Sequence, residues 1–562
     1  MNRNYKLLFL LSVILFFTFI NTFNQLYAQK DKQVKRGKDG EIENTEVIIE
    51  KNRKLDLPEA ERNFEKINSP IKRTEPQAQK YDKLVEPAYQ LPDINTKFQL
   101  LPPAEEIQKQ IPGNYIKGGF EPIYSGTYFE AFLNNNRNKN YSYGLHAKHL
   151  GFAEGPVNKK NSATGDQSIK GFYKYSRDFL NFNSSLDYSR KQLYFYGYKP
   201  IKEVKRDTIK QIFNIVNFKT DLTNRTSDSL IGYKFNINVR NISDAYKAKE
   251  FEFGLRLGGD YVISKNISAL INSEFYFTTR KDLAGSLNRN LFRLQPTIKY
   301  TQGLLNFEFG LNFVSQNDTT RNLSKLNVYP IGKVYYGLSN HFSVFASLTG
   351  DIQRNTLNNF VAENPWINQN ISLQNTNKQT DFTAGFKAGI GNALSFQLSG
   401  SYERYKNLYF FVNSAKDSTR FDAIYEGLYT KVFKTTGELI FDQNNLRMGL
   451  KADFYNYSLT TFSTPFHRPT FVGNFFAKYN IGKNLYFNID FYYISGIKAR
   501  KNLTEQQPLS AIADLNLKAE YFLKGNFSVF ASLNNVFSNK YQRYLNYSNR
   551  GFQSMLGFTY AF

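Results

Sequence analysis

The sequence predicts an all-β fold: a transmembrane antiparallel β-barrel of about 22 strands (18–22), preceded by a mostly irregular N-terminal tail. Three observations predict this fold. Long segments alternate between apolar and polar residues, tight polar turns recur between these segments, and the chain begins with a pattern typical of exported proteins. A barrel strand needs the alternation because one of its faces meets lipid and the other meets the wet interior.

The alternation of apolar and polar residues is strict in several segments. In 305–313, Leu305 and Phe307 face one side, whereas Asn306 and Glu308 face the other. The same period of two recurs in 446–454 and 485–493. A soluble β-sandwich also alternates, so the length of the strands, the export signal and the aromatic content together favour a membrane barrel.

The number of short turns between these segments predicts the number of strands. Asn and Gly recur in them, and both tolerate the left-handed backbone that tight hairpins require. The turns fall near residues 137, 176, 226, 264, 303, 340, 391, 444, 483 and 525. Longer connectors fall near 151–165, 199–206, 281–289, 317–323, 354–378, 460–468, 499–508 and 538–548, and the first strand pair is placed around 114–134. We expect the short turns to face the periplasm and the longer loops to face outward.

The composition restricts the class of protein. Aromatic residues make up 16% of the chain, whereas the mean hydropathy is -0.49, which argues against a bundle of membrane helices. The absence of cysteine excludes disulfides and thiolate metal sites. The net charge of +24 comes from scattered basic residues, which favours lipopolysaccharide and anionic solutes over nucleic acid as partners.

The N-terminus predicts export. Residues 1–28 resemble a signal peptide, with Arg3 and Lys6 before an apolar core over 7–20 and a cleavage site after Ala28. An uncleaved membrane helix is the alternative, but it would need an apolar run of about 18 residues.

Two further regions follow the signal peptide. Residues 29–112 are charged and punctuated by proline, which predicts a partly disordered tail in the periplasm or in the barrel lumen. Residues 113–562 carry the repeated strands and are the predicted outer-membrane barrel.

The C-terminal strand has an outward apolar row. In RGFQSMLGFTYAF, the residues Phe552, Phe558, Tyr560 and Phe562 share one phase of the alternation. We expect them to form the signal that the barrel-assembly machinery recognises, on a strand that closes the barrel against the first one.

A distinctive turn precedes this last strand. It consists of Asn535, Val536, Phe537, Asn539, Lys540 and Tyr541. The turn resembles the last hairpin of the TonB-dependent receptor barrels, and the likeness in strand length and turn style extends over 113–562. The resemblance implies a barrel of about 22 strands and a function in uptake.

The tail departs from that family. Its members carry a folded plug inside the barrel, and residues 29–112 are too few and too polar for one, so the chain resembles a relative without a plug. One segment of the tail is similar to a TonB box, a short stretch that pairs with a strand edge of TonB. It consists of Thr45, Glu46, Val47, Ile48 and Ile49.

The sequence shows no catalytic or metal-binding pattern. His146 and His149 lie three residues apart, which places them on opposite faces of a strand. His341 falls at a predicted short turn, and His467 falls in a longer connector. Because no nucleophile elbow or phosphate-binding loop appears either, we expect no enzymatic activity, no cofactor and no metal site.

The loop 354–378 is the best candidate for recognition of an external ligand. It contains Pro365 and the single tryptophan of the chain, Trp366. The alternative is that Trp366 anchors the barrel at the membrane interface, where tryptophan is common.

Two functions remain open at this point. The first is a receptor-like barrel that transports a polar solute or polymer across the outer membrane. The second is a structural or assembly barrel without a plug, which holds periplasmic or surface proteins through the tail. Expected partners are outer-membrane lipids, lipopolysaccharide, the barrel-assembly machinery and TonB or another protein.

Overall fold

The structure is a computed structural model. It describes residues 113–135, 140–177, 179–198, 204–224, 230–318, 325–391, 393–482, 484–501, 505–523 and 526–562. The predicted signal peptide, the tail and the TonB-box-like segment Thr45–Ile49 lie outside the described residues. Within the described ranges, no helix has both the length and the apolar character needed to cross a membrane.

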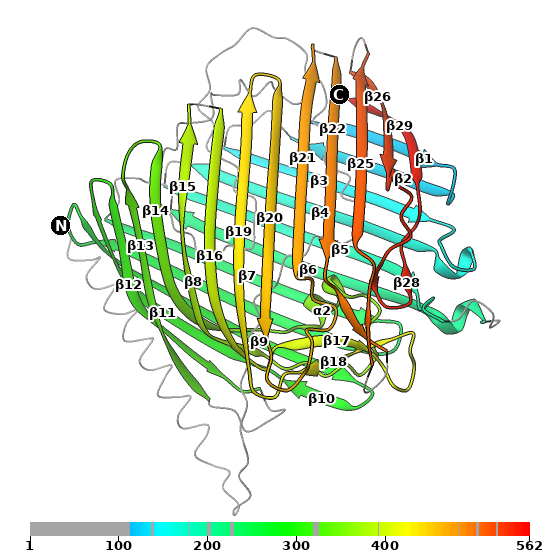
Figure 1. The fold of residues 1–562 in the computed structure, drawn as a ribbon. Helices are drawn as coiled ribbons and strands as arrows, with labels where there is room; N and C mark the ends of the chain where they lie inside the picture. The colour runs from blue at the N-terminus through cyan, green and yellow to red at the C-terminus, as the bar shows by residue number, and fades with distance from the viewer. Residues whose placement is uncertain are drawn as a thin grey trace, which may run out of the picture. The chain divides into compact units, whose positions relative to one another are not determined.

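The described strands form a closed antiparallel barrel of 22 strands, as the sequence predicts (Figure 1). The barrel strands are β1 (Tyr115–Glu121), β2 (Gly126–Asn134), β3 (Tyr141–Phe152), β4 (Thr164–Arg177), β5 (Leu180–Tyr194), β6 (Lys210–Asn224), β7 (Ile231–Asp244), β8 (Lys249–Val262), β9 (Ile267–Asp282), β11 (Leu291–Gln302), β12 (Leu305–Gln316), β13 (Leu326–Gly337), β14 (Phe342–Gln353), β15 (Thr376–Ile390), β16 (Leu394–Lys406), β19 (Tyr429–Gln443), β20 (Leu446–Ser458), β21 (Phe471–Ile481), β22 (Leu485–Ser495), β25 (Ile512–Phe522), β26 (Phe527–Asn534) and β29 (Gln553–Ala561). The short strand β10 (Gly285–Asn288) pairs with β9, and β23 (Lys498–Arg500) pairs with β24 (Gln506–Pro508) in a loop.

The barrel closes where β1 pairs with β29. Tyr115 lies opposite Ala561 in this seam, and the backbone N–H of Phe562 donates to the carbonyl of Asn114 over 2.9 Å. Closure leaves no unpaired strand edge, which is the condition for β-structure in a hydrocarbon environment.

The two ends of the barrel differ in the length of their connections. All ten predicted short turns join strands at one end, where β1 begins and β29 finishes. Gly391 and Asn444 in these turns have φ of 59° and 51°, the left-handed backbone that the turn residues predict. The longer connections lie at the opposite end, hereafter the long-loop end.

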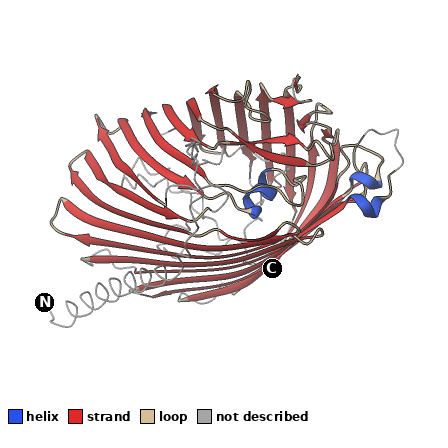
Figure 2. Ribbon diagram, turned by 90° about the horizontal axis from the view of Figure 1, so that it is seen from below, coloured by secondary structure: helices blue, strands red, loops and turns tan. Residues whose placement is uncertain are grey.

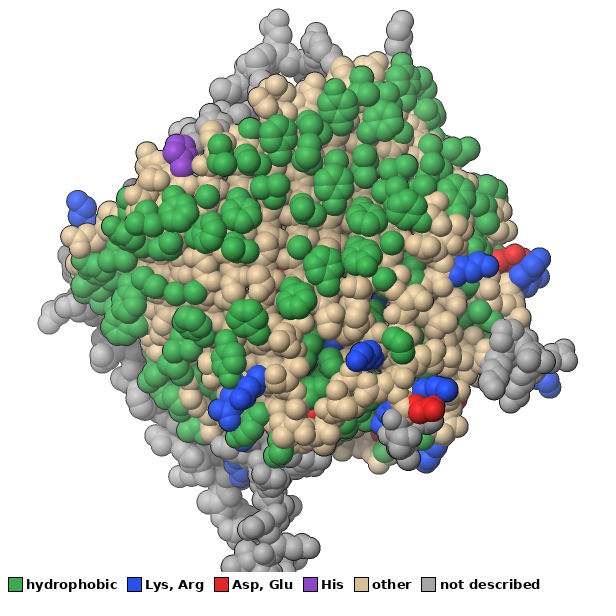
Figure 3. Space-filling view, in the orientation of Figure 1, with side chains coloured by type: hydrophobic (Ala, Val, Ile, Leu, Met, Phe, Trp, Pro, Cys, Tyr) green, Lys and Arg blue, Asp and Glu red, His purple; other side chains and the backbone are tan. Residues whose placement is uncertain are grey.

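The outer and inner faces of the barrel divide as the alternation predicts. On β20, Leu450 and Phe454 are 48% and 52% exposed on the outside, whereas Asp453 points inward and pairs with Lys434 over 3.0 Å. Hydrophobic side chains are spread over the whole face shown in Figure 3, and most of its Lys and Arg side chains lie toward its lower and right edges. The exterior therefore suits lipid, as expected for a membrane barrel.

Ion pairs line the inner wall, some between paired strands and one between strands further apart. Arg293 of β11 lies between Glu274 and Asp351, and its Nη2 is 2.7 Å from the Asp351 carboxylate. Lys333 pairs with Glu308 over 3.1 Å. The lumen surface is therefore hydrophilic, with many of its charges compensated in pairs.

Candidate binding surface: a cap of long loops

Four long connections fold together at the long-loop end and form a compact cap (Figure 2). The cap consists of residues 354–375, 407–428, 459–470 and 535–552. It contains α2 (Leu357–Glu363), the hairpin of β17 (Tyr409–Asn413) and β18 (Phe421–Tyr425), and the pair β27 (Gln542–Tyr544) and β28 (Tyr547–Ser548). The connection 407–428 is absent from the loops that the sequence predicts.

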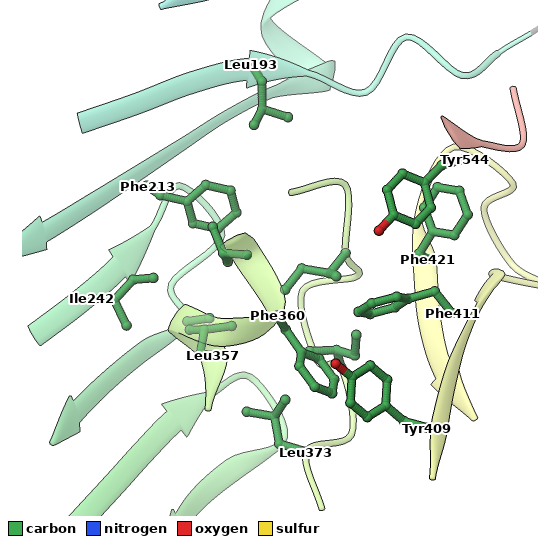
Figure 4. Packing of buried hydrophobic residues seen from close by; sticks show 14 of the residues in the cluster. Leu193, Phe213, Ile242, Leu357, Phe360, Leu373, Tyr409, Phe411, Phe421 and Tyr544 are labelled. Atoms are coloured by element: carbon green, nitrogen blue, oxygen red, sulfur yellow. The ribbon is translucent and has the colours of Figure 1, made fainter. Parts of the chain in front are cut away.

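Strand β17 is buried on both of its faces. Tyr409 and Phe411 pack in one hydrophobic cluster with α2 and with the long-loop ends of β5, β6 and β7 (Figure 4). Phe410 and Val412 pack in a second cluster with residues at the long-loop ends of β16, β19, β20, β21, β22 and β25. Because these two groups of strands belong to different parts of the barrel wall, the hairpin bridges the lumen at this end.

Hydrogen bonds fix α2 to the barrel wall. Both carboxylate oxygens of Glu250 accept from the backbone N–H of Leu357, over 2.9 and 3.0 Å. The side chain of Thr356 caps the helix by accepting from the N–H of Asn359 over 3.2 Å. These contacts satisfy N–H groups that a helix start leaves without an intrahelical partner.

A buried arginine ties both ends of the loop 354–375 to its neighbours. Arg289 donates to the carbonyl of Asn355 over 2.5 Å and lies 3.4 Å from the Asp318 carboxylate. Asp318 in turn accepts from the backbone N–H of Asn375 over 2.7 Å. The ends of this loop are therefore held by a charged network rather than by apolar contacts alone.

His467 joins three parts of the cap. Its Nδ1 lies 2.7 Å from the carbonyl of Phe411, and its Nε2 accepts from the backbone N–H of Leu545 over 3.2 Å. This arrangement fits a neutral ring with the proton on Nδ1. Burial, and to a smaller extent the charge of Arg543, lower the pKa of His467 to about 3, although the hydrogen bond to Phe411 acts in the opposite direction.

A second buried group links the loop 459–470 to α2. The guanidinium of Arg468 pairs with Glu363 over 3.2 Å and lies 4.8 Å from the ring centre of Tyr409. Glu363 also accepts from the hydroxyl of Tyr409. Removing one member of such a buried pair would leave an uncompensated charge, which is costly.

Trp366 lies inside the cap, and Pro365 precedes it in a half-buried position. The indole stacks on Tyr547 with ring centres 4.1 Å apart and meets Tyr196 edge-on at 5.9 Å. The indole Nε1 has no hydrogen-bond partner in the described part of the chain. Trp366 thus belongs to an aromatic cluster of several loops, and its role in recognition stays a prediction.

The remaining predicted residues lie elsewhere. Phe558, Tyr560 and Phe562 are exposed by 46–47% on the outer face at the seam, and Phe552 precedes β29. Their role as an assembly signal stays a prediction.

The other histidines occupy separate positions on the barrel. His146 reaches inward to Glu130, whereas His149 contacts Thr127 among exposed side chains, so the two lie on opposite faces as predicted. His341 lies in a short turn. Within the described residues, no group of three or more His, Cys, Asp and Glu is arranged to hold a metal ion.

One sequence signal could have revealed the cap. Residues 408–412, LYFFV, form a continuous apolar run between Asn407 and Asn413, without the alternation of the barrel strands. Such a run is typical of a strand buried on both faces. The contacts of His467, by contrast, have no local signal because its partners lie far along the chain.

Comparison with known proteins identifies the fold. No family model matches the chain, and no curated protein matches it by sequence. Among solved structures, the FrpB iron transporter from Neisseria meningitidis matches with a TM-score of 0.63 at 13% identity, covering 80% of this chain and 81% of that one. This is the fold of a TonB-dependent receptor barrel.

Two further solved structures have a similar barrel fold. The siderophore receptor PirA from Acinetobacter baumannii matches with a TM-score of 0.61 at 10% identity, over 80% of each chain. The ferric enterobactin receptor PfeA in complex with BCV-L6 matches with a TM-score of 0.59 at 11% identity, over 80% of this chain and 81% of that one. These identities are low, so the likeness to TonB-dependent receptors concerns the fold. The predicted lack of a plug falls on residues outside the described part.

Proposed function

We propose that this chain is an outer-membrane barrel, similar to TonB-dependent receptors, that transports a polar solute or polymer across the outer membrane. The observation that carries the proposal is the closed 22-strand barrel, whose inner wall is hydrophilic and whose outer face is apolar. The similar structures, named as an iron transporter and as siderophore receptors, support transport. In this proposal the tail 29–112 contacts TonB through Thr45–Ile49.

The cap is the barrier that a solute meets at the long-loop end. Its two hydrophobic clusters hold the hairpin β17–β18 between separate parts of the wall, so passage requires the hairpin or its neighbours to move. Trp366 and the tyrosines around it are the groups that a ligand would meet when the cap opens.

Solute release from liposomes tests the proposal. The double variant Phe411→Ala and Phe421→Ala should loosen the cap, since each truncation of a buried Phe costs about 3–5 kcal/mol. We expect this variant to release an entrapped sugar several-fold faster than the unchanged protein, and faster still when residues 30–112 are deleted as well. The matched control is Phe307→Ala and Phe309→Ala, a ring pair on the outer face.

A second candidate function is that of a structural or assembly barrel. The closely packed cap favours this function, because a barrel whose long-loop end stays closed would not conduct solutes. If release stays at background in every variant while the barrel remains folded, the transport proposal loses its basis. A stoichiometric protein that copurifies through residues 30–112 would then support the structural function.

A further inference from the structure

The outer face of β16 and β19 changes character at the long-loop end. Outward pairs along this ladder begin with Leu394 opposite Phe441 and continue to Tyr402 opposite Phe433. Tyr402 and Phe433 are 40% and 51% exposed. The eight steps from Leu394 to Tyr402 span ~27 Å along the strand, and less along the membrane normal because barrel strands tilt. The apolar belt therefore ends near Tyr402.

Cations occupy the next outward positions. Arg404 lies directly opposite Lys431, and Lys406 lies opposite Tyr429. The Arg404 guanidinium is 3.9 Å and the Lys406 Nζ is 4.8 Å from the ring centre of Tyr429. The ring thus holds both cations on the outer face, just beyond the apolar belt.

This arrangement lacks a compensating anion. Like charges directly opposite each other on a sheet destabilise it. Elsewhere on this barrel, charged neighbours such as Lys434 and Asp453 are paired. Among the described residues, no acidic group forms an ion pair with Arg404, Lys406 or Lys431, and the Nε of Arg404 is buried without a hydrogen-bond partner.

We propose that Arg404, Lys406 and Lys431 bind the phosphorylated headgroup of an outer-leaflet glycolipid of the lipid A type, whose acyl chains lie against Tyr402 and Phe433. The site is where a lipid phosphate would lie when the apolar belt is in the hydrocarbon. A guanidinium beside an ammonium supplies several donors to phosphate oxygens. The inference rests on the outer-membrane placement in the proposed function, but it does not require transport.

Native mass spectrometry of the purified full-length protein tests this site. The probes are diphosphoryl lipid A, dephosphorylated lipid A and inorganic phosphate. We expect the unchanged protein to retain diphosphoryl lipid A, and the double variant Arg404→Gln and Lys431→Gln to bind it about 30-fold more weakly, because each cation near a membrane surface contributes about one kcal/mol. The matched control is Lys387→Gln and Lys451→Gln, which removes two inward-facing cations.

A second measurement keeps the test independent of folding. In detergent without lipid A, the Arg404→Gln and Lys431→Gln variant should be at least as stable as the unchanged protein, because the substitutions remove a like-charge pair. Added diphosphoryl lipid A should then stabilise the unchanged protein more than the variant. Equal binding by both proteins, equal binding of dephosphorylated lipid A, or binding of inorganic phosphate at the same strength would overturn the proposal. None of these outcomes depends on solute release, so the two proposals can fail separately.

Discussion

At the residue scale, we expect His467 to make the cap sensitive to pH. Its ring is neutral in the closed cap, where burial is the largest cause that lowers its pKa to about 3. In an open cap the ring would have the ordinary pKa of histidine, about 6.5. The open form therefore binds a proton that the closed form does not, over the interval between these two values.

We expect acid to favour opening of the cap. As the pH falls below about 6.5, the free energy of opening should decrease by about 1.4 kcal/mol for each pH unit, until the pH reaches the pKa of the closed form. Trp366 is the single tryptophan of the chain and lies in the cap, so its quenching by iodide reports the opening. Quenching should increase as the pH is lowered from about 7 to about 4.

The variant His467→Gln is the control for this titration. It removes the ionisable ring, so the pH dependence of Trp366 quenching should flatten. An unchanged slope in the variant, or no pH dependence in the unchanged protein, would contradict the assignment of the effect to His467.

At the scale of elements, the barrel strands and β17 differ in which of their faces are buried. The strands β12, β20 and β22 expose one face to the outside and one to the lumen, so their period of two could be predicted from the sequence. Strand β17 has buried side chains on both faces, and its run LYFFV interrupts that period. The predicted barrel is therefore confirmed, while the hairpin β17–β18 was missed.

The outward row of β29 carries a prediction about assembly. Phe562→Ser should lower the amount of folded barrel in the outer membrane several-fold, if Phe558, Tyr560 and Phe562 form the assembly signal. The control is Phe527→Ser on β26, which removes an exposed aromatic ring that stacks on Phe558 at 5.8 Å. The measurement is the heat-modifiable band of the barrel in outer-membrane fractions. Equal loss in both variants would indicate a general packing defect rather than a signal.

At the scale of the whole molecule, we expect the stability of the barrel in a membrane to depend on its apolar outer face and its hydrophilic inner face. Leu450→Arg places a charge on the outer face near the middle of β20, where Leu450 pairs with Leu439. We expect the free energy of unfolding in lipid vesicles to fall by about 2–4 kcal/mol. Urea titration followed by the gel shift of the folded barrel measures it.

The neighbouring position provides the control for that prediction. Lys451→Arg puts the same side chain one residue further along, on the inner face, and should change the free energy of unfolding by less than about 0.5 kcal/mol. If both variants lose the same stability, the outer face of the barrel does not meet lipid, and the membrane placement is wrong.

The sequence by itself determined a closed barrel of about 22 strands (18–22), its short turns and its two faces, and the structure has 22 strands. These features depend on the period-two alternation and on turn residues, which act between neighbours in the chain, and on the rule that backbone groups in hydrocarbon must pair. Only the tertiary structure decided the cap, in which Trp366 and Tyr547 stack from distant loops and Trp366 also meets Tyr196 just past the end of β5. It also decided the register that places Arg404 opposite Lys431. Contacts between distant segments leave no periodic trace in the sequence, because any polar or aromatic loop residue could have formed them.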